Sequence, residues 1–314
     1  MAIASKAAAA AADTGTAAPP RRARPRSSKL PVLLVAPALI LLALFIFAPA
    51  CYALYLSLMK VQVSGGLLGT TTRQVFAGLS NYTATFDDPE FWSSLGRMLI
   101  VAVIGVPATV LLATLFALCL DASRARLTTV SRLAIFLPYA VPGVVASLLG
   151  GFLYLPATSP IGGAAVNYFG SKMVFFTVTN VAVWGVAGFN TVVLYTALKA
   201  LPPETIQAAR IDGASELRIA MRIKLPLIAP AVGMISLFSV IGALQLFNEP
   251  TALRPLANAI TSTWVPLMRV YSDAFVSNNI YGGAASAFTL LVMTVAATVA
   301  VRLVTSRISG RNAQ

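Results

Sequence analysis

Residues 202–226 have the sequence PPETIQAARIDGASELRIAMRIKLP. This polar and basic segment lies between two apolar runs, at 174–198 and 227–247. Each run is close to the about 20 apolar residues that an α-helix needs to cross a bilayer. The segment is therefore a connection between two membrane-spanning helices, and the sequence predicts an integral membrane protein.

Four further apolar runs lie outside this connection. The six predicted spans are 31–58, 98–119, 133–155, 174–198, 227–247 and 284–304. Each must be helical, because lipid offers the backbone no hydrogen-bond partner. Membrane bundles tolerate prolines and glycines, and small residues let helices approach closely; such residues are Pro107, Pro138, Pro142, Gly185 and Gly188. The predicted fold is all-α, with six transmembrane helices and a cytoplasmic helix-turn-helix loop between spans 4 and 5.

The composition agrees with this class and excludes several chemistries. Only 11% of the residues are charged, and the mean hydropathy is +0.81, whereas soluble domains carry about 25% charged residues. The chain has no histidine, which excludes Ser–His triads and His-ligated metal sites. It has no P-loop motif for ATP. Cys51 and Cys119 lie in apolar runs and are interpreted as small buried hydrophobic residues. We expect no cofactor, no metal site and no enzymatic activity in this chain.

The distribution of basic residues predicts the orientation in the membrane. If the N-terminal side is called inside, 17 of the 23 Lys and Arg residues fall in inside-facing segments. Positive charge marks cytoplasmic segments, so both termini are expected in the cytoplasm. This topology also accounts for the net charge of +13 without a nucleic-acid partner.

Three regions are expected along the chain. Residues 1–29 form a basic tail without apolar periodicity, which predicts disorder. The six-span transmembrane domain is expected at 30–306, and a short cytoplasmic tail at 307–314. The first apolar run, Leu30 to Leu58, is too long for a cleaved signal peptide.

The loop at 202–226 is predicted to form two short helices around a turn. Pro203 suits the first position of a helix. Gly213 is placed to end the first helix in the left-handed conformation. Asp212 is predicted to cap the second helix, which would begin at Gly213 or Ala214. Pro226 is expected to end that helix before the fifth span.

The second helix of the loop has two apolar stripes, because residues four apart share a face. Leu217 and Met221 form one stripe, and Ile219 and Ile223 form the other. Two stripes predict one surface against the protein's own bundle and one for a partner. The alternative is an amphipathic helix that lies on lipid headgroups; the small alanines of the loop favour a protein partner.

The loop resembles a known family. The pattern Q-A-A-x-x-D-G-A followed by I-x-L-P-x-x-x-P, from Gln207 to Pro230, is similar to the coupling loop of permease subunits in binding-protein-dependent ABC importers. The resemblance implies that the loop docks on a separate ATPase, and that the protein lies in the inner membrane of a bacterial cell. The residues implied in this coupling are Gln207, Ala208, Ala209, Asp212, Gly213, Ala214 and Leu217. Gln207 replaces the usual Glu of the family, and Lys224 stands where Thr is common.

Weaker similarities extend over most of the chain. Gly78 to Tyr82 with Asp88 to Trp92 is similar to the first outer loop of sugar permeases, and Arg132 to Pro142 to their third span. These features are typical of the carbohydrate-uptake branch, the maltose and glycerol-3-phosphate type. In the outer connections, the aromatic residues are interpreted as interface anchors and together as a surface that a partner could hold; they include Trp92, Trp264, Tyr271 and Tyr281.

The spans contain almost no ionisable residues, so coupling to protons or sodium is not expected. Uncharged polar and aromatic side chains remain in spans 4 and 5, and such groups can bind sugar hydroxyls and rings. They are Asn180, Trp184, Phe189, Asn190, Ser239, Gln245 and Asn248. Resemblance to maltose-type permeases adds Gly185, Val186, Gly242 and Ala243 to the expected substrate path. For each residue, helix packing is the alternative.

The sequence therefore predicts a permease subunit of an ATP-driven ABC importer, with sugars as the expected solutes. Polyamines, phosphate esters or peptides are alternative solutes, and a secondary carrier or a membrane-embedded enzyme are alternative classes. The expected partners are a second permease, ATP-binding cassette subunits, an extracytoplasmic solute-binding protein and membrane lipid.

Overall fold

The computed structural model describes residues 30–64, 71–122, 127–160 and 166–311. The predicted tail at 1–29 lies outside these residues. The chain divides into two compact units, residues 1–50 and 51–314. In the first unit the apolar run forms α1 (Leu30–Leu42), a π-helical turn η1 (Ala43–Phe47) and the start of α2 (Ala48–Ser57).

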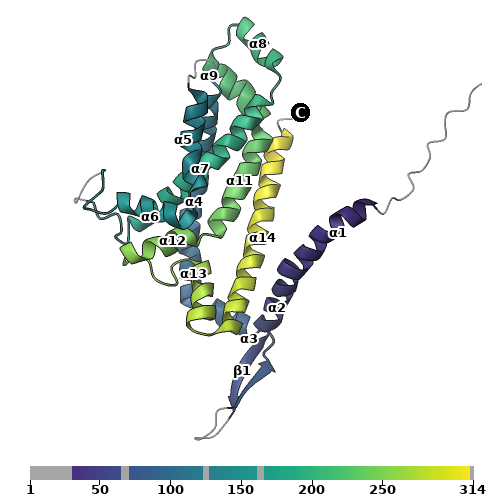
Figure 1. The fold of residues 1–314 in the computed structure, drawn as a ribbon, viewed down its shortest axis with the longest axis vertical. Helices are drawn as coiled ribbons and strands as arrows, with labels where there is room; N and C mark the ends of the chain where they lie inside the picture. Colours follow the sequence, from purple (N-terminus) through teal and green to yellow (C-terminus); the bar gives the residue numbers. More distant parts are fainter. Residues whose placement is uncertain (1–29, 65–70, 123–126, 161–165, 312–314) are drawn as a thin grey trace, which may run out of the picture. The chain divides into compact units, whose positions relative to one another are not determined.

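The second unit is a helical bundle with its long helices side by side (Figure 1). Four helices carry most of its length: α4 (Pro89–Leu120), α7 (Val174–Lys199), α11 (Ala229–Leu244) and α14 (Ile280–Arg311). α7 packs on α4 and on α5 (Thr128–Ala140), and α11 packs on α4 and α14. α14 continues to Arg311, beyond the predicted domain limit at 306.

Two buried clusters hold α4 and α7 together. One, on the side of the outer connections, includes Met98, Val178, Trp264 and Val265. The other, toward the opposite end, includes Ala113, Ala117, Leu194, Leu198 and Ile235. Close approach depends on small residues, as predicted: a Cβ added at Gly188 of α7 would overlap the carbonyl oxygen of Ile135 in α5. Both cysteines, however, are exposed rather than buried.

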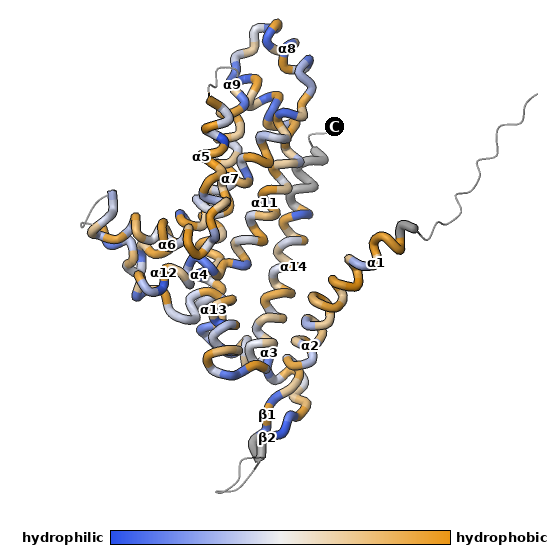
Figure 2. The backbone as a smooth tube through the Cα atoms, in the orientation of Figure 1, coloured by the Kyte–Doolittle hydropathy of each residue, from blue (hydrophilic) through white to orange (hydrophobic). Residues whose placement is uncertain are grey.

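Four helices of the described residues are long and apolar enough to cross a membrane: Val32–Ser57, Pro89–Leu120, Val174–Lys199 and Ile280–Leu303. Two further helix pairs are long and apolar enough together but are bent between their halves. Thr128–Ala140 meets Gly143–Leu153 at 103°, and Glu216–Leu227 meets Ala229–Leu244 at 69°. Six spans result if each bent pair counts as one. Figure 2 shows hydrophilic residues concentrated in the connections at the ends of the bundle.

The third predicted span, 133–155, is not one straight helix. Val141 has the extended backbone angles φ −81° and ψ 136°, and Pro142 follows it. A residue before proline is forced out of the helical region by the proline ring, so α5 ends at Ala140 and α6 (Gly143–Leu153) runs in a new direction. α6 packs against α12 (Asn248–Leu253), where a Cβ at Gly151 would lie 2.6 Å from Leu253 Cδ2.

The connections contain structure that the sequence patterns did not reveal. β1 (Met59–Ser64) and β2 (Thr71–Phe76) form an antiparallel hairpin in which Met59 pairs with Phe76. α3 (Ser80–Asp87) follows the hairpin. The last outer connection contains α12, the 3₁₀ turn η4 (Arg254–Leu256), α13 (Pro266–Tyr271) and the π-helical turn η5 (Ser272–Val276). α3 and α13 lie at one end of the bundle, opposite the 202–226 loop (Figure 1).

Candidate functional site

The 202–226 loop folds into two short helices around a turn, as predicted. α8 (Pro203–Ile211) is followed by α9 (Glu216–Ile219), which continues through the π-helical turn η3 (Ala220–Lys224) and α10 (Leu225–Leu227). The chain bends at Ile228, two residues after Pro226, before α11 begins. The loop lies at the same end of the bundle as the last turns of α14 (Figure 1).

The turn between the two helices is a Schellman motif. Gly213 has φ +75°, which only glycine adopts without strain. The Ala214 N–H donates to the Ala209 carbonyl at 3.0 Å, and the Gly213 N–H donates to Arg210 at 3.0 Å. These two bonds satisfy carbonyls that the end of α8 leaves unpaired. The expected role of Asp212 as the cap of the second helix is wrong: Ser215 holds that position, and its hydroxyl accepts from the Arg218 N–H.

The two apolar stripes of the second helix separate in the structure as predicted. Ile219 is fully buried against the protein, and Ile223 is half-buried. Leu217 is 75% exposed and Met221 is 53% exposed. Ile211, at the end of α8, is 87% exposed. We call the three exposed side chains, Ile211, Leu217 and Met221, the loop face.

An ion-pair cluster lies at the base of the loop. Asp121, directly after α4, pairs with Lys199 at the end of α7 and with Lys224 at the end of η3. The Asp121 side chain is 7% exposed and that of Lys224 is 5% exposed. Burial alone would raise the pKa of Asp121, but the hydrogen bonds and charges of the two lysines outweigh it and lower the pKa below its usual value.

A cavity of about 340 Å³ lies between α4, α5, α7, α11 and the start of α12. This volume is at the lower end of the range for small-molecule sites. Eight of the eleven residues expected on the substrate path line this cavity. They are Val186, Phe189, Asn190, Ser239, Gly242, Ala243, Gln245 and Asn248. The structure thus gathers in one place residues that lie up to about 60 positions apart in the sequence.

Other expected residues lie elsewhere. Gly185 does not line the cavity, and the space around its Cα is open. Asn180 accepts a hydrogen bond from the Tyr154 hydroxyl at 2.5 Å, so its amide serves helix packing. Ala243 and Asn248 do line the cavity.

The cavity wall combines stacked aromatic rings with unpaired or weakly paired polar groups. Tyr139 of α5 stacks on Phe189 with 4.8 Å between ring centroids. The Asn190 amide donates to Ser239 Oγ at 3.3 Å, which joins α7 to α11. Among the described residues, the buried Thr179 hydroxyl has no hydrogen-bond partner, and Thr179 lines the cavity. A buried hydroxyl without a partner costs about 1–3 kcal/mol.

The wall also contains residues that the sequence patterns did not assign to the substrate path, among them Tyr139 and Glu249. Tyr139 lies in α5, whose packing against α7 places it beside Phe189. Glu249 lies in the first turn of α12. Both positions depend on how separate helices pack, which no local pattern reveals.

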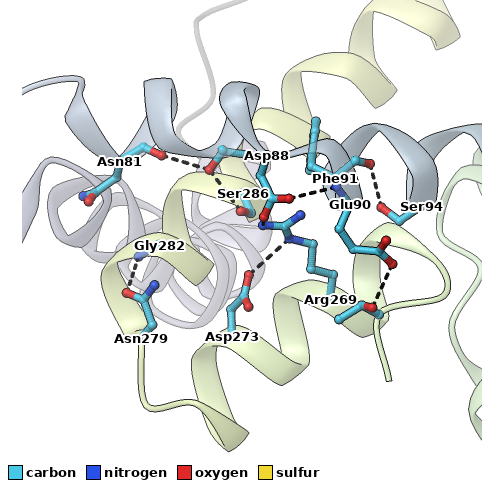
Figure 3. Close-up of polar contacts among 12 residues, drawn as sticks. Asn81, Asp88, Glu90, Phe91, Ser94, Arg269, Asp273, Asn279, Gly282 and Ser286 are labelled. Carbon is cyan, nitrogen blue, oxygen red and sulfur yellow. Dashed lines mark hydrogen bonds and ion pairs between the residues drawn. The ribbon is translucent and has the colours of Figure 1, made fainter. Parts of the chain in front are cut away.

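A second polar cluster joins α3 and α4 to α13 at the opposite end of the bundle (Figure 3). Arg269 of α13 pairs with Asp88, the N-cap of α4, at 2.5 Å and with Asp273 at 3.4 Å. Arg97 pairs with Glu90 at 2.6 Å and donates to the Trp264 carbonyl at 2.7 Å. We call these six residues the outer cluster; it fixes the outer connections against each other.

The outer cluster corrects part of the expectation for the aromatic residues. Trp264 is only 2% exposed and packs in the core, so it is not part of a surface for a partner. Trp92 and Tyr271 are about half exposed, at 47% and 51%.

The hydrogen bond of Arg269 lowers the pKa of Asp88, against the opposing effect of burial.

The bundle, the bent passages and the loop define a polytopic helical membrane protein built for transport. The sn-glycerol-3-phosphate transport system permease protein UgpA of Escherichia coli O157:H7 is 31% identical over 291 residues, which cover 87% of this chain and 93% of UgpA. The sulfoquinovosyl glycerol transport system permease protein SmoG of Agrobacterium fabrum is 29% identical over 229 residues, which cover 70% of this chain and 72% of SmoG. No family model matches the chain.

A solved structure has the same fold. A chain of the bacterial alginate ABC transporter, in complex with an alginate pentasaccharide-bound periplasmic protein, superposes with a TM-score of 0.71 at 17% identity, over 89% of this chain and 95% of that chain. The chain described here belongs to the family of ABC transport-system permease subunits.

Proposed function

We propose that this chain forms one half of the translocation path of a sugar importer, and that ATP is hydrolysed on separate subunits which dock on the 202–226 loop. The observation that carries this proposal is the loop itself. Its turn is rigidly capped, one stripe is anchored in the bundle, and the loop face is exposed at the tip. An exposed apolar face beside a buried one is typical of a surface that a partner covers.

The proposed assembly contains a second permease, two ATP-binding cassette subunits and an extracytoplasmic binding protein. The alginate ABC transporter was solved with a periplasmic protein bound, which supports such a partner here. Both termini and the loop are assigned to the cytoplasm, and the outer cluster to the other side, because basic residues are concentrated in the loop and the tails.

Gly213→Asp tests the coupling role of the loop. An aspartate at φ +75° is strained relative to glycine and adds a negative charge to the turn. We expect ATP-dependent uptake into vesicles to be lost while membrane insertion is retained. Gly213→Asn is the matched control, because asparagine tolerates left-handed angles about as well as aspartate does but adds no charge. Normal uptake by the aspartate variant contradicts the coupling role, and uptake that follows an ion gradient without ATP supports a secondary carrier.

A further inference from the structure

The cavity wall lacks positive charge among the described residues. This is unexpected, because the names of the related permeases refer to anionic solutes. Glycerol 3-phosphate and sulfoquinovosyl glycerol carry a phosphate and a sulfonate, and alginate carries carboxylates. Proteins hold such groups with arginine, lysine or helix N-termini. Among the described residues, none that line this cavity is arginine or lysine.

The only ionisable acid among the described lining residues is Glu249, in the first turn of α12. A carboxylate at a helix start offsets the partial positive charge of the backbone N–H groups there. α12 therefore offers little attraction for an anion. Burial raises the pKa of the Glu249 carboxyl, and in neither protonation state does the group provide a positive charge.

The remaining wall suits an uncharged carbohydrate. The amides of Asn190, Gln245 and Asn248 can each donate and accept hydrogen bonds, as the hydroxyls of a sugar require. The Tyr139 and Phe189 rings offer apolar faces on which the C–H face of a sugar can pack.

We propose that this cavity accepts neutral sugars and rejects anionic ones, and that Glu249 sets the preference. The inference rests on the proposed function of the cavity as part of the translocation path. It goes further by excluding the phosphate esters and acidic sugars that the names of the relatives suggest. An anionic solute in this partly buried site loses hydration without a cationic partner and is repelled by the Glu249 carboxylate when that group is ionised, which corresponds to a loss in affinity of roughly tenfold or more.

The test is solute binding to the complete importer complex, purified in lipid nanodiscs without the binding protein, so that the cavity alone selects. Maltose and trehalose serve as neutral probes, and glycerol 3-phosphate and glucuronate as anionic probes at matched ionic strength. A solute that binds the folded state raises the unfolding temperature. We expect the neutral probes to raise it and the anionic probes, at equal concentration, to leave it unchanged.

Glu249→Gln removes the charge while keeping the side-chain length, and should narrow the difference between the two probe sets. Asp87→Asn, an exposed carboxylate at the end of α3, is the matched control and should leave the difference unchanged. Anionic probes that stabilise the wild type as strongly as neutral ones overturn the proposal. An unchanged difference in Glu249→Gln overturns the role of Glu249. The wild-type comparison decides the selectivity even if the variant does not fold.

The two proposals fail in different ways. If no probe of either kind shifts the unfolding temperature and the importer takes up no sugar in vesicles with ATP, the proposed function is wrong and this inference falls with it. If ATP-dependent uptake occurs but the solute is anionic, only the selectivity inference is wrong.

Discussion

The ammonium group of Lys224 lies 2.6 Å from Oδ2 of Asp121, and the ammonium group of Lys199 lies 2.8 Å from Oδ1 of the same carboxylate. Lys199 lies just before the 202–226 loop, and Lys224 lies near the end of the loop. One carboxylate at the end of α4 therefore holds both ends of the loop. If the loop moves, either α4 and α7 move with it or these ion pairs break. The cluster therefore couples the loop to the α4–α7 core.

Removing Asp121 should destabilise the protein strongly. Asp121→Asn leaves the buried Lys224 without its partner, and breaking a buried ion pair from one side costs about 3–5 kcal/mol. Lys199→Met is the matched control, because Lys199 is 55% exposed and surface pairs contribute only about 0–1 kcal/mol. Thermal unfolding in nanodiscs measures both.

The double variant Asp121→Asn with Lys224→Met tests the same pair further. Removing both charges should recover a large part of the stability lost in Asp121→Asn alone, because no buried charge is then left unpaired. If the double variant instead loses as much stability as Asp121→Asn and Lys224→Met lose together, the two side chains act independently, which would contradict the ion pair.

Leu217→Asp should weaken the association with the ATP-binding subunits. Leu217 is 75% exposed on the loop face, and an apolar residue at the centre of an interface contributes about 2 kcal/mol or more to binding. Co-purification of the complex should fall by about tenfold or more. Phe76→Asp, at a side chain that is 73% exposed on β2, is the control at the other end of the bundle and should leave co-purification unchanged. Equal losses in the two variants would mean that the effect is general.

Gly188→Ala should reduce stability, whereas Gly185→Ala in the same helix should not. A Cβ at position 188 overlaps the backbone of Ile135, while at position 185 nothing lies within 4 Å. Overpacking costs about 1–3 kcal/mol, and alanine in an open helical position gains up to about 1 kcal/mol over glycine. Opposite signs of the two shifts in unfolding temperature are the expected result; equal shifts would contradict the close crossing of α5 and α7.

The contribution of Asp88 to stability should be constant from neutral pH down to about pH 5 and disappear only in stronger acid. Arg269 lowers the pKa of Asp88 below its usual value of 3.8 in the folded state. A carboxyl group with a lowered pKa stabilises the fold above its unfolded pKa, and this stabilisation is lost as the pH falls through the folded pKa. The difference in unfolding temperature between wild type and Asp88→Asn measures it. A difference that already shrinks between pH 7 and 5 would contradict the ion pair.

The sequence by itself determined the class of the fold, the positions of the apolar segments and the format of the loop. Apolar length fixes a span because lipid leaves the backbone no partner but itself. The Gly213 turn and the two stripes around Ile219 and Leu217 follow from local periodicity and local backbone angles. These features depend on neighbours within about four residues, so a linear reading finds them.

Only the tertiary structure decided which polar groups meet. The packing of α5 on α7 brings Tyr139 to Phe189, the return of α12 brings Glu249 into the cavity, and Asp121 pairs with Lys224, 103 positions away. Such contacts depend on how helices cross, which is set by the summed packing of many small and large side chains. No single segment of the sequence carries that information.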